Sequence, residues 1–217
     1  EFRRVLFRSF RFVLPGPVVS EAEYQACFDY VAAHMPKKFL VISGGLAPGV
    51  PIDFYARLTA LAKAHQVRVV LDANGPALHA ALQTGVFLFK PSLRELRELT
   101  GQALPDEASW IAACQHLIQT GQAEVVALSL GEDGAMVISA NQSWRSPGLK
   151  VDVHTTIGAG DSFVAGMVWA FSQDHQVLKA FQYGMAAGAG ALLGTGTSLC
   201  QAHDVHGLLP QVVVHAV

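Results

Sequence analysis

The sequence predicts a single α/β domain in which a mostly parallel sheet lies between two layers of helices. Short apolar runs alternate with longer segments of helical spacing, and Gly, Pro or polar residues bound the apolar runs. In addition, 51% of the 217 residues are apolar, which is enough to bury one substantial core. We therefore expect crossover connections, helices on both faces of the sheet, and ligand sites at the carboxyl ends of the strands.

Buried strands are predicted where a short run of Val, Leu, Ile or Phe is too brief to form a helix. Two further strands, at residues 134–139 and 144–151, are expected toward one edge of the sheet. The four buried strands are predicted at residues 38–43, 67–72, 86–90 and 124–130.

Helices are predicted where apolar residues recur every three or four positions. A short helix, residues 93–100, is expected after the third buried strand. In the last third of the chain, two long segments are rich in small residues, so we expect two closely packed helices there. The longer helices are predicted at residues 20–34, 51–65, 106–119, 159–172 and 177–193.

Charge and cysteine usage narrow the classes of partner. The chain has 15 Lys and Arg against 17 Asp and Glu, so no overall positive field would attract nucleic acid or an anionic membrane. Cys27, Cys114 and Cys200 are far apart and lack a C-x-x-C spacing, which disfavours a disulfide framework or a zinc site. No apolar run is long enough to span a bilayer. We expect a cytoplasmic protein with a small-molecule partner.

The first nine residues differ from the rest of the chain. They carry Arg3, Arg4 and Arg8 among apolar residues and continue poorly into the strand-like segment 10–14. We expect residues 1–9 to be non-native or disordered, with a short basic docking arm as the alternative. The predicted domain covers residues 10–217.

The segment 155–163, with sequence TTIGAGDSF, is the strongest functional motif. Its glycines allow a tight turn directly before an apolar helix, so several N–H groups would point toward the positive end of the helix dipole. Such a turn binds anions. Asp161, which follows it, could accept a proton from a hydroxyl that attacks a phosphoryl group. The ordinary structural explanation is a helix start capped by Asp161.

The whole string resembles the second signature of the PfkB family of carbohydrate kinases, D-T-x-G-A-G-D-x-F, with Thr155 in place of Asp. The resemblance runs from about residue 10 to the C-terminus. It implies a three-layer α/β/α, ribokinase-like (Rossmann-like) fold in which the N-terminal part and most of a small β lid are missing. Further segments that match in the expected order are 43–49, 90–96, 129–134 and 184–200.

The resemblance also implies roles for residues of this turn and of the 90–95 segment. Asp161 is expected to be the catalytic base and a substrate contact, and the amides of Gly158, Ala159 and Gly160 would stabilise the transferred phosphoryl. Glu95 is expected to hold Mg²⁺ through water. Ser92 replaces the Asn that is usual in the family. Without the resemblance, Glu95 would be read as a solvated acid in the first helical turn.

Nucleotide and cation contacts are implied in the same way. We expect ATP to contact Ser129, Gly131, Gly134, Thr155 and Ala189, although Ser129 and Gly131 equally suit an ordinary tight turn. Gly45 is the expected sugar contact, by its backbone. A loop that uses mostly backbone carbonyls is implied for K⁺, at Thr155, Ile157, Ala191, Gly194, Gly196 and Ser198.

The expected reaction is ATP-dependent phosphorylation of a sugar phosphate. Fructose 6-phosphate is the first candidate, and fructose 1-phosphate and tagatose 6-phosphate are the alternatives. A catalytically silent nucleotide-binding relative is the alternative of another class. No G-x-G-x-x-G follows the first strand, which disfavours a dinucleotide-dependent oxidoreductase. We expect the full-length protein to be a homodimer and these 217 residues to bind nucleotide weakly and to phosphorylate poorly or not at all.

Overall fold

The computed structural model describes residues 16–217. The predictions for residues 1–9, and for a lid strand at residues 10–15, lie outside the described residues.

The described residues form one seven-stranded sheet whose strands lie side by side in sequence order. The first four strands pair in parallel and the last three pairings are antiparallel, which confirms the α/β fold class and makes the sheet a mixed one. The strands are β1 (Phe39–Ser43), β2 (Arg68–Asp72), β3 (Val86–Phe89), β4 (Ala123–Ser129), β5 (Ala135–Ser139), β6 (Ser143–Ser146) and β7 (His215–Ala216).

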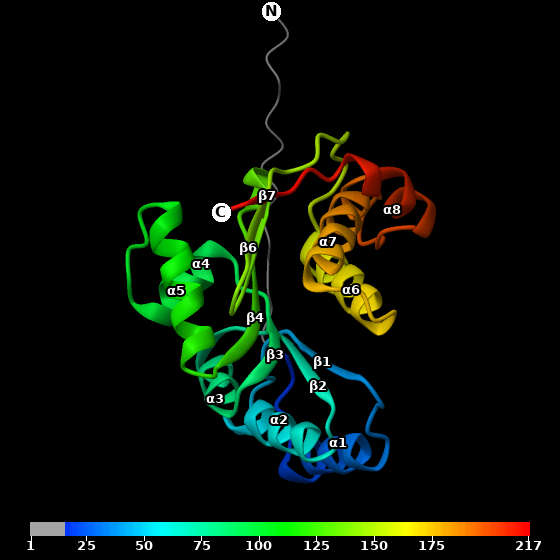
Figure 1. The fold of residues 1–217 in the computed structure, drawn as a ribbon. Coiled ribbons are helices and arrows are strands. Elements are labelled where there is room, and N and C mark those ends of the chain that lie inside the picture. The colour runs from blue at the N-terminus through cyan, green and yellow to red at the C-terminus, as the bar shows by residue number, and fades with distance from the viewer. Residues whose placement is uncertain (1–15) are drawn as a thin grey trace, which may run out of the picture.

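Helices cover both faces of this sheet, as Figure 1 shows. The helices that connect the parallel strands pack on one face, and the C-terminal helices pack on the other. On the first face lie α1 (Glu21–Ala33), α2 (Phe54–Ala64), α3 (Gly75–Thr84), α4 (Leu93–Thr100) and α5 (Glu107–Gln119); on the second lie α6 (Ala159–Ser172), α7 (Val177–Leu192) and α8 (Ala202–Leu208).

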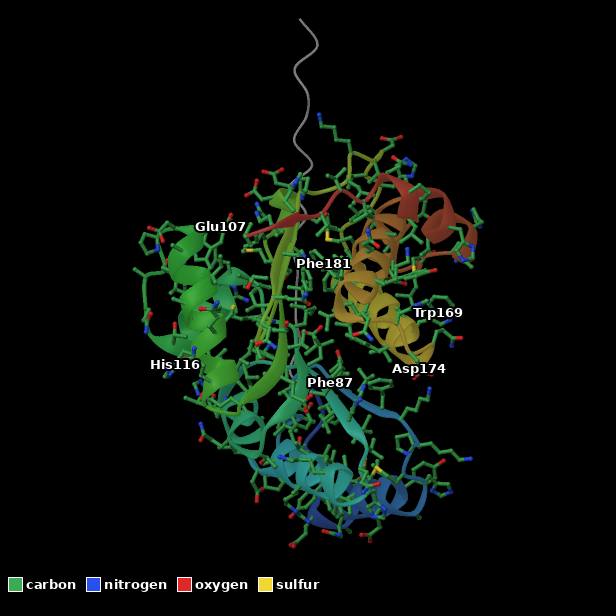
Figure 2. The ribbon with its side chains drawn as sticks, viewed as in Figure 1. Phe87, Glu107, His116, Trp169, Asp174 and Phe181 are labelled. Carbon is green, nitrogen blue, oxygen red and sulfur yellow. The ribbon has the colours of Figure 1, made fainter. Side chains whose placement is uncertain are left out.

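Alternating side chains of the strands divide the interior into two cores. In β2, Val69 and Leu71 face the first layer of helices, whereas Val70 faces the second, because successive strand residues point to opposite faces. Phe87 and Phe181 are buried between the sheet and the C-terminal helices (Figure 2). Both faces are therefore apolar, as the near-continuous apolar runs predict.

Several segments differ from the sequence-based expectations, and α8 and β7 are among the elements that the sequence analysis did not assign. The strand expected at 144–151 is shorter, because β6 ends at Ser146 and Pro147 follows. Residues 75–84 form α3, a helix that the sequence analysis did not assign. It begins with Gly75 and Pro76, a pair typical of turns, but Pro also suits the first turn of a helix.

The two long C-terminal helices approach closely because glycines lie where they cross. A Cβ added to Gly166 of α6 would lie 2.6 Å from the Tyr183 carbonyl oxygen of α7. A Cβ added to Gly184 of α7 would lie 2.7 Å from Cγ of Met167. This confirms the close packing expected from the small residues and fixes the position of α6, which carries the signature motif at its start.

Within residues 16–217, none of the helices combines the length and the apolarity that crossing a membrane would require.

Candidate active site

The turn before α6 leaves backbone amides without partners inside the helix. Gly158 is the N-cap, with φ 79° and ψ −1°, a left-handed conformation that glycine adopts at little cost. The first helical hydrogen bond runs from the Ser162 N–H to the Gly158 carbonyl, at 2.8 Å. The amides of Ala159 and Gly160 therefore remain free at the positive end of the helix dipole. The local geometry is that of an anion-binding turn.

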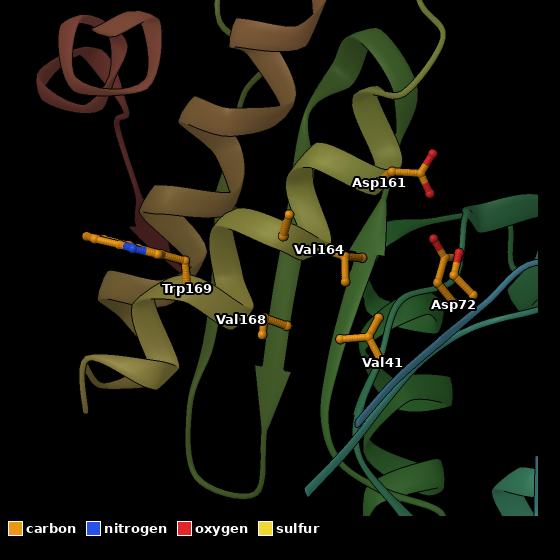
Figure 3. A pocket seen from close by; sticks show the side chains of 8 residues that line it. Val41, Asp72, Asp161, Val164, Val168 and Trp169 are labelled. Atoms are coloured by element: carbon orange, nitrogen blue, oxygen red, sulfur yellow. The ribbon is translucent and has the colours of Figure 1, made fainter. Parts of the chain in front are cut away.

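Asp161 follows this turn as the third residue of α6, and it is exposed. None of the ion pairs found within residues 16–217 involves its carboxylate. The side chain lines a pocket of about 420 Å³ together with Asp72 of β2. Figure 3 shows the two carboxylates at one end of this pocket and Trp169 at the other. Asp161 is therefore open to a small molecule.

A buried ion pair lies beside the turn. Lys90 directly follows β3, its side chain is 8% exposed, and its Nζ lies 3.1 Å from Oδ1 of Asp72. A Cβ added to Gly160 would lie 3.7 Å from the same Nζ, which places the ammonium against the turn. Burial raises the pKa of Asp72 above its usual value, Lys90 opposes this increase, and the carboxylates of Glu95 and Asp161 add to it.

This pair is the part of the site that the sequence analysis missed. Asp72 enters the sequence analysis only as the last residue of a predicted strand, and Lys90 only as the start of the 90–95 segment. The sequence did contain a signal for this charge, because Lys90 directly follows the strand VFLF, whose residues are all buried. A charge at the carboxyl end of a buried parallel strand points to a ligand site or to a buried partner.

Glu95 lies in the first turn of α4 and forms a capping box with Ser92. The Ser92 N–H and hydroxyl donate to Oε2 of Glu95, at 2.7 and 2.9 Å, and the Glu95 N–H donates to the Ser92 hydroxyl at 3.2 Å. The helix-start role considered for Glu95 is therefore present in the structure. The charge of its carboxylate also adds to the increase in the pKa of Asp72.

Ser129 and Gly131 lie at the carboxyl end of β4, next to Ser92. The Ser129 N–H donates to the Pro91 carbonyl at 2.9 Å, and Ser92 and Ser129 form an isolated parallel bridge. Gly131 begins a short 3₁₀ turn with φ 65°. A Cβ added to Gly134 would lie 2.1 Å from the Ser146 carbonyl oxygen, so this glycine also allows close strand packing.

The six residues predicted to bind K⁺ come from two segments that the structure brings together. The Thr155 hydroxyl donates to the Gly196 carbonyl at 3.0 Å. The Gly194 N–H donates to the Ala191 carbonyl at 3.2 Å, and a Cβ added to Gly194 would lie 3.2 Å from Cβ of Ser198. Ile157 is 59% exposed beside the same turn.

The remaining predicted contacts, Gly45 for the sugar and Ala189 for the nucleotide, differ in where they lie in the fold. Gly45 follows β1, and a Cβ added to it would lie 3.7 Å from Oδ1 of Asn74, which follows β2. Both residues are thus at the same edge of the sheet as Asp72. Ala189 of α7 is 7% exposed and packs in the core beneath the C-terminal helices. Its role as a nucleotide contact stays a prediction.

The donor set of the site suits a hydrated divalent cation rather than a cage of side chains. Within the described part of the chain, no group of three His, Cys, Asp or Glu side chains could hold a metal ion directly. Asp72 and Asp161 nevertheless line the same pocket, and the charge of Glu95 adds to the increase in the pKa of Asp72. Mg²⁺ prefers oxygen ligands and keeps several of its waters, so these residues fit it through water.

Together, the fold and the site define an α/β protein with an anion-binding turn and an open carboxylate beside it, at the carboxyl ends of parallel strands. This arrangement suits transfer of a phosphoryl group. The family model of the pfkB family carbohydrate kinases matches residues 11–204, and the chain belongs to that family.

Several relatives are similar over most of the chain. ATP-dependent 6-phosphofructokinase isozyme 2 from Mycobacterium tuberculosis is 39% identical over 199 residues, which cover 91% of this chain and 58% of the relative. 1-Phosphofructokinase from Borreliella burgdorferi is 31% identical over 201 residues, covering 92% of this chain and 64% of the relative.

A solved structure confirms the ribokinase-like fold. The crystal structure of phosphofructokinase-2 from Escherichia coli in complex with potassium has a TM-score of 0.88 at 32% identity. The similarity covers 93% of this chain and 66% of that chain. The chain thus spans about three fifths of the length of the curated relatives it matches.

Proposed function

We propose that this chain carries the phosphoryl-transfer site of an ATP-dependent sugar-phosphate kinase. The observation that carries the proposal is the position of Asp161, an exposed carboxylate directly after a turn whose amides are free to bind an anion. A phosphoryl group bound at the turn would have the base next to the hydroxyl that attacks it. The family to which the chain belongs supports the same reaction class.

In this reaction Asp161 accepts the proton of the acceptor hydroxyl as the hydroxyl oxygen bonds to the γ-phosphorus of ATP, while the bond from that phosphorus to the β–γ bridging oxygen breaks and ADP leaves. The amides of Gly158, Ala159 and Gly160 donate to the oxygens of the transferred group, on which negative charge is distributed. Lys90 adds a positive charge next to the same turn, held in place by Asp72. Under this proposal, positioning and electrostatic stabilisation come from these side chains and amides.

The cofactors follow from the donor groups. Asp72, Glu95 and Asp161 would hold Mg²⁺ through water, where the ion would neutralise charge on the phosphates of ATP. The carbonyls and hydroxyls of the loop that joins Thr155 to Gly196 would suit K⁺, and potassium is named for the similar Escherichia coli structure.

We propose fructose 6-phosphate as the acceptor, because the relative at 39% identity is named as a 6-phosphofructokinase. Fructose 1-phosphate is the second candidate, supported by the relative named 1-phosphofructokinase. Tagatose 6-phosphate remains the third. Gly45 offers only its backbone to a sugar, so it does not choose among these acceptors. We further propose that a longer protein containing this chain is a homodimer.

The test compares the chain with its Asp161→Asn variant. ATP binding is measured by calorimetry, and transfer of radiolabelled γ-phosphate to fructose 6-phosphate, fructose 1-phosphate and tagatose 6-phosphate is measured separately. We expect both proteins to bind ATP with similar affinity. We expect transfer by the chain to be slow and transfer by the variant to be at least about 100-fold slower, because a general base contributes that much.

The outcomes separate the alternatives. Transfer that survives Asp161→Asn would exclude Asp161 as the base. ATP binding with no transfer to any of the three acceptors, both by the chain and by a longer protein that contains it, would favour a nucleotide-binding relative without activity. A chain that does not bind ATP would contradict the proposal as a whole.

A further inference from the structure

The Ser92–Glu95 capping box is unusual in its location. The same chain contains a second box of the same type at the start of α1, where the Ser20 N–H and hydroxyl donate to Oε2 of Glu23, at 2.8 and 2.7 Å. That box is exposed and is far from the site in sequence, whereas the Ser92 box is half-buried and follows β3 at the carboxyl edge of the parallel strands.

The two oxygens of the Glu95 carboxylate have different hydrogen-bond partners in the Ser92 box. Both donors of Ser92 bind Oε2. None of the hydrogen bonds or ion pairs found in residues 16–217 uses Oε1, which leaves this oxygen as an acceptor for water. The box thus fixes the carboxylate by one oxygen and frees the other.

Two neighbours connect this carboxylate to the rest of the site. The N-cap is joined to the end of β4, because the Ser129 N–H donates to the Pro91 carbonyl and Ser92 bridges Ser129. On the other side, the charge of Glu95 acts on Asp72, which is paired with Lys90. The Ser92 box therefore lies between the strand end expected to contact ATP and the cluster of carboxylates.

We propose that Ser92 is a positioning residue for the metal: by holding Oε2 of Glu95, it presents Oε1 to the water shell of Mg²⁺. This inference rests on the proposed function, because the metal enters with the nucleotide. It gives a role to the one position of the 90–95 segment at which the chain departs from the family pattern. A serine hydroxyl holds the carboxylate here without a side-chain amide.

A matched pair of variants tests the inference. Ser92→Ala and Ser20→Ala each remove a hydroxyl that donates to a glutamate in the first helical turn, one at the site and one at α1, and each should lower the melting temperature. ATP binding is measured by calorimetry in EDTA and across a series of Mg²⁺ concentrations. We expect Ser92→Ala to raise the Mg²⁺ concentration needed for half-maximal enhancement by about tenfold, as loss of an outer-shell partner does. Ser20→Ala should leave that concentration unchanged.

Two further measurements make the result specific. Ser92→Thr keeps a hydroxyl at the N-cap and should restore the Mg²⁺ response. In EDTA all variants should bind ATP within about twofold of the unchanged chain, a difference in binding free energy of about 0.4 kcal/mol at most. Mn²⁺ binding, followed by electron paramagnetic resonance, should weaken only in Ser92→Ala.

An equal Mg²⁺ response of Ser92→Ala and Ser20→Ala would overturn the positioning role and leave only helix capping. If the unchanged chain binds ATP but Mg²⁺ does not enhance binding, the inference fails while the proposed function stands. If the unchanged chain does not bind ATP at all, the proposed function fails first and the inference fails with it.

Discussion

At the scale of single residues, Gly158 controls whether the amides of the turn can point to one anion. Its φ of 79° is strained for any residue with a Cβ, and that Cβ would also lie 3.2 Å from Cδ2 of Leu199. The left-handed conformation costs about 1–2 kcal/mol in other residues. We expect Gly158→Ala to weaken ATP binding about tenfold, as measured by calorimetry, because the turn relaxes away from this geometry.

The control for this variant is Gly207→Ala, in α8. A Cβ there would have no neighbour within 4 Å, so ATP affinity should not change. Gly158→Ala with the affinity of the unchanged chain would mean that the amides of the turn do not hold the nucleotide.

The residues of the candidate site differ in how far the sequence alone could identify them. Asp161 and the glycines of its turn are contiguous, so one string of residues was enough to predict both the turn and the carboxylate beside it. Lys90 and Asp72 are 18 positions apart, and their ion pair exists only because β2 and β3 are neighbours in the sheet. Residue types could not reveal that pairing, since it depends on strand order. Both interpretations of Glu95, in the first turn of a helix and at the metal site, came from the sequence, but its hydrogen bonds with Ser92 required coordinates.

At the scale of helices and strands, the close packing of α6 against α7 fixes the position of the turn at which α6 begins. Gly166→Ala would place a Cβ 2.6 Å from a backbone oxygen of α7, which cannot move as a side-chain tip can. We expect this change to lower the free energy of unfolding by about 1–3 kcal/mol, as overpacking does, despite the better helix propensity of Ala. Chemical denaturation followed by circular dichroism measures it.

Gly207→Ala again provides the comparison, because it adds the same methyl group to a helix with open space around it. It should be neutral or should stabilise the fold by up to about 1 kcal/mol. If both variants are equally stable, the two helices are not in the close contact described here. Because α6 begins at the turn, Gly166→Ala should also weaken ATP binding.

The elements themselves were largely predictable, because burial on both faces produces near-continuous apolar runs in parallel strands. β1 to β4 and the two long C-terminal helices lie where these runs and the small-residue segments predicted them. α3 was missed although Ala77, Leu78, Ala81 and Leu82 form a buried stripe, because its Gly-Pro start resembles a turn. The last three pairings of the sheet are antiparallel, and local sequence patterns hold little information on the direction of strand pairing.

At the scale of the whole molecule, the described sheet has an apolar edge. β1 is the first strand in the sheet order, and Val41 in its centre is 45% exposed. Val41 lines the same pocket as Trp169 of α6, which is 47% exposed. An apolar edge strand with unpaired backbone groups is a template for pairing with another chain. We therefore expect the 217-residue chain to self-associate as its concentration rises.

Val41→Lys tests this expectation, because a charge on an edge strand opposes edge-to-edge pairing. Analytical ultracentrifugation should show a smaller fraction of associated chain at the same concentration. The free energy of unfolding should change by no more than about 0.5 kcal/mol, since the side chain is substantially exposed. Val18→Lys adds the same charge at a residue that is 77% exposed and outside the sheet, and it should not reduce association to the same degree. Equal effects of the two changes would indicate that net charge, and not the edge of β1, limits association.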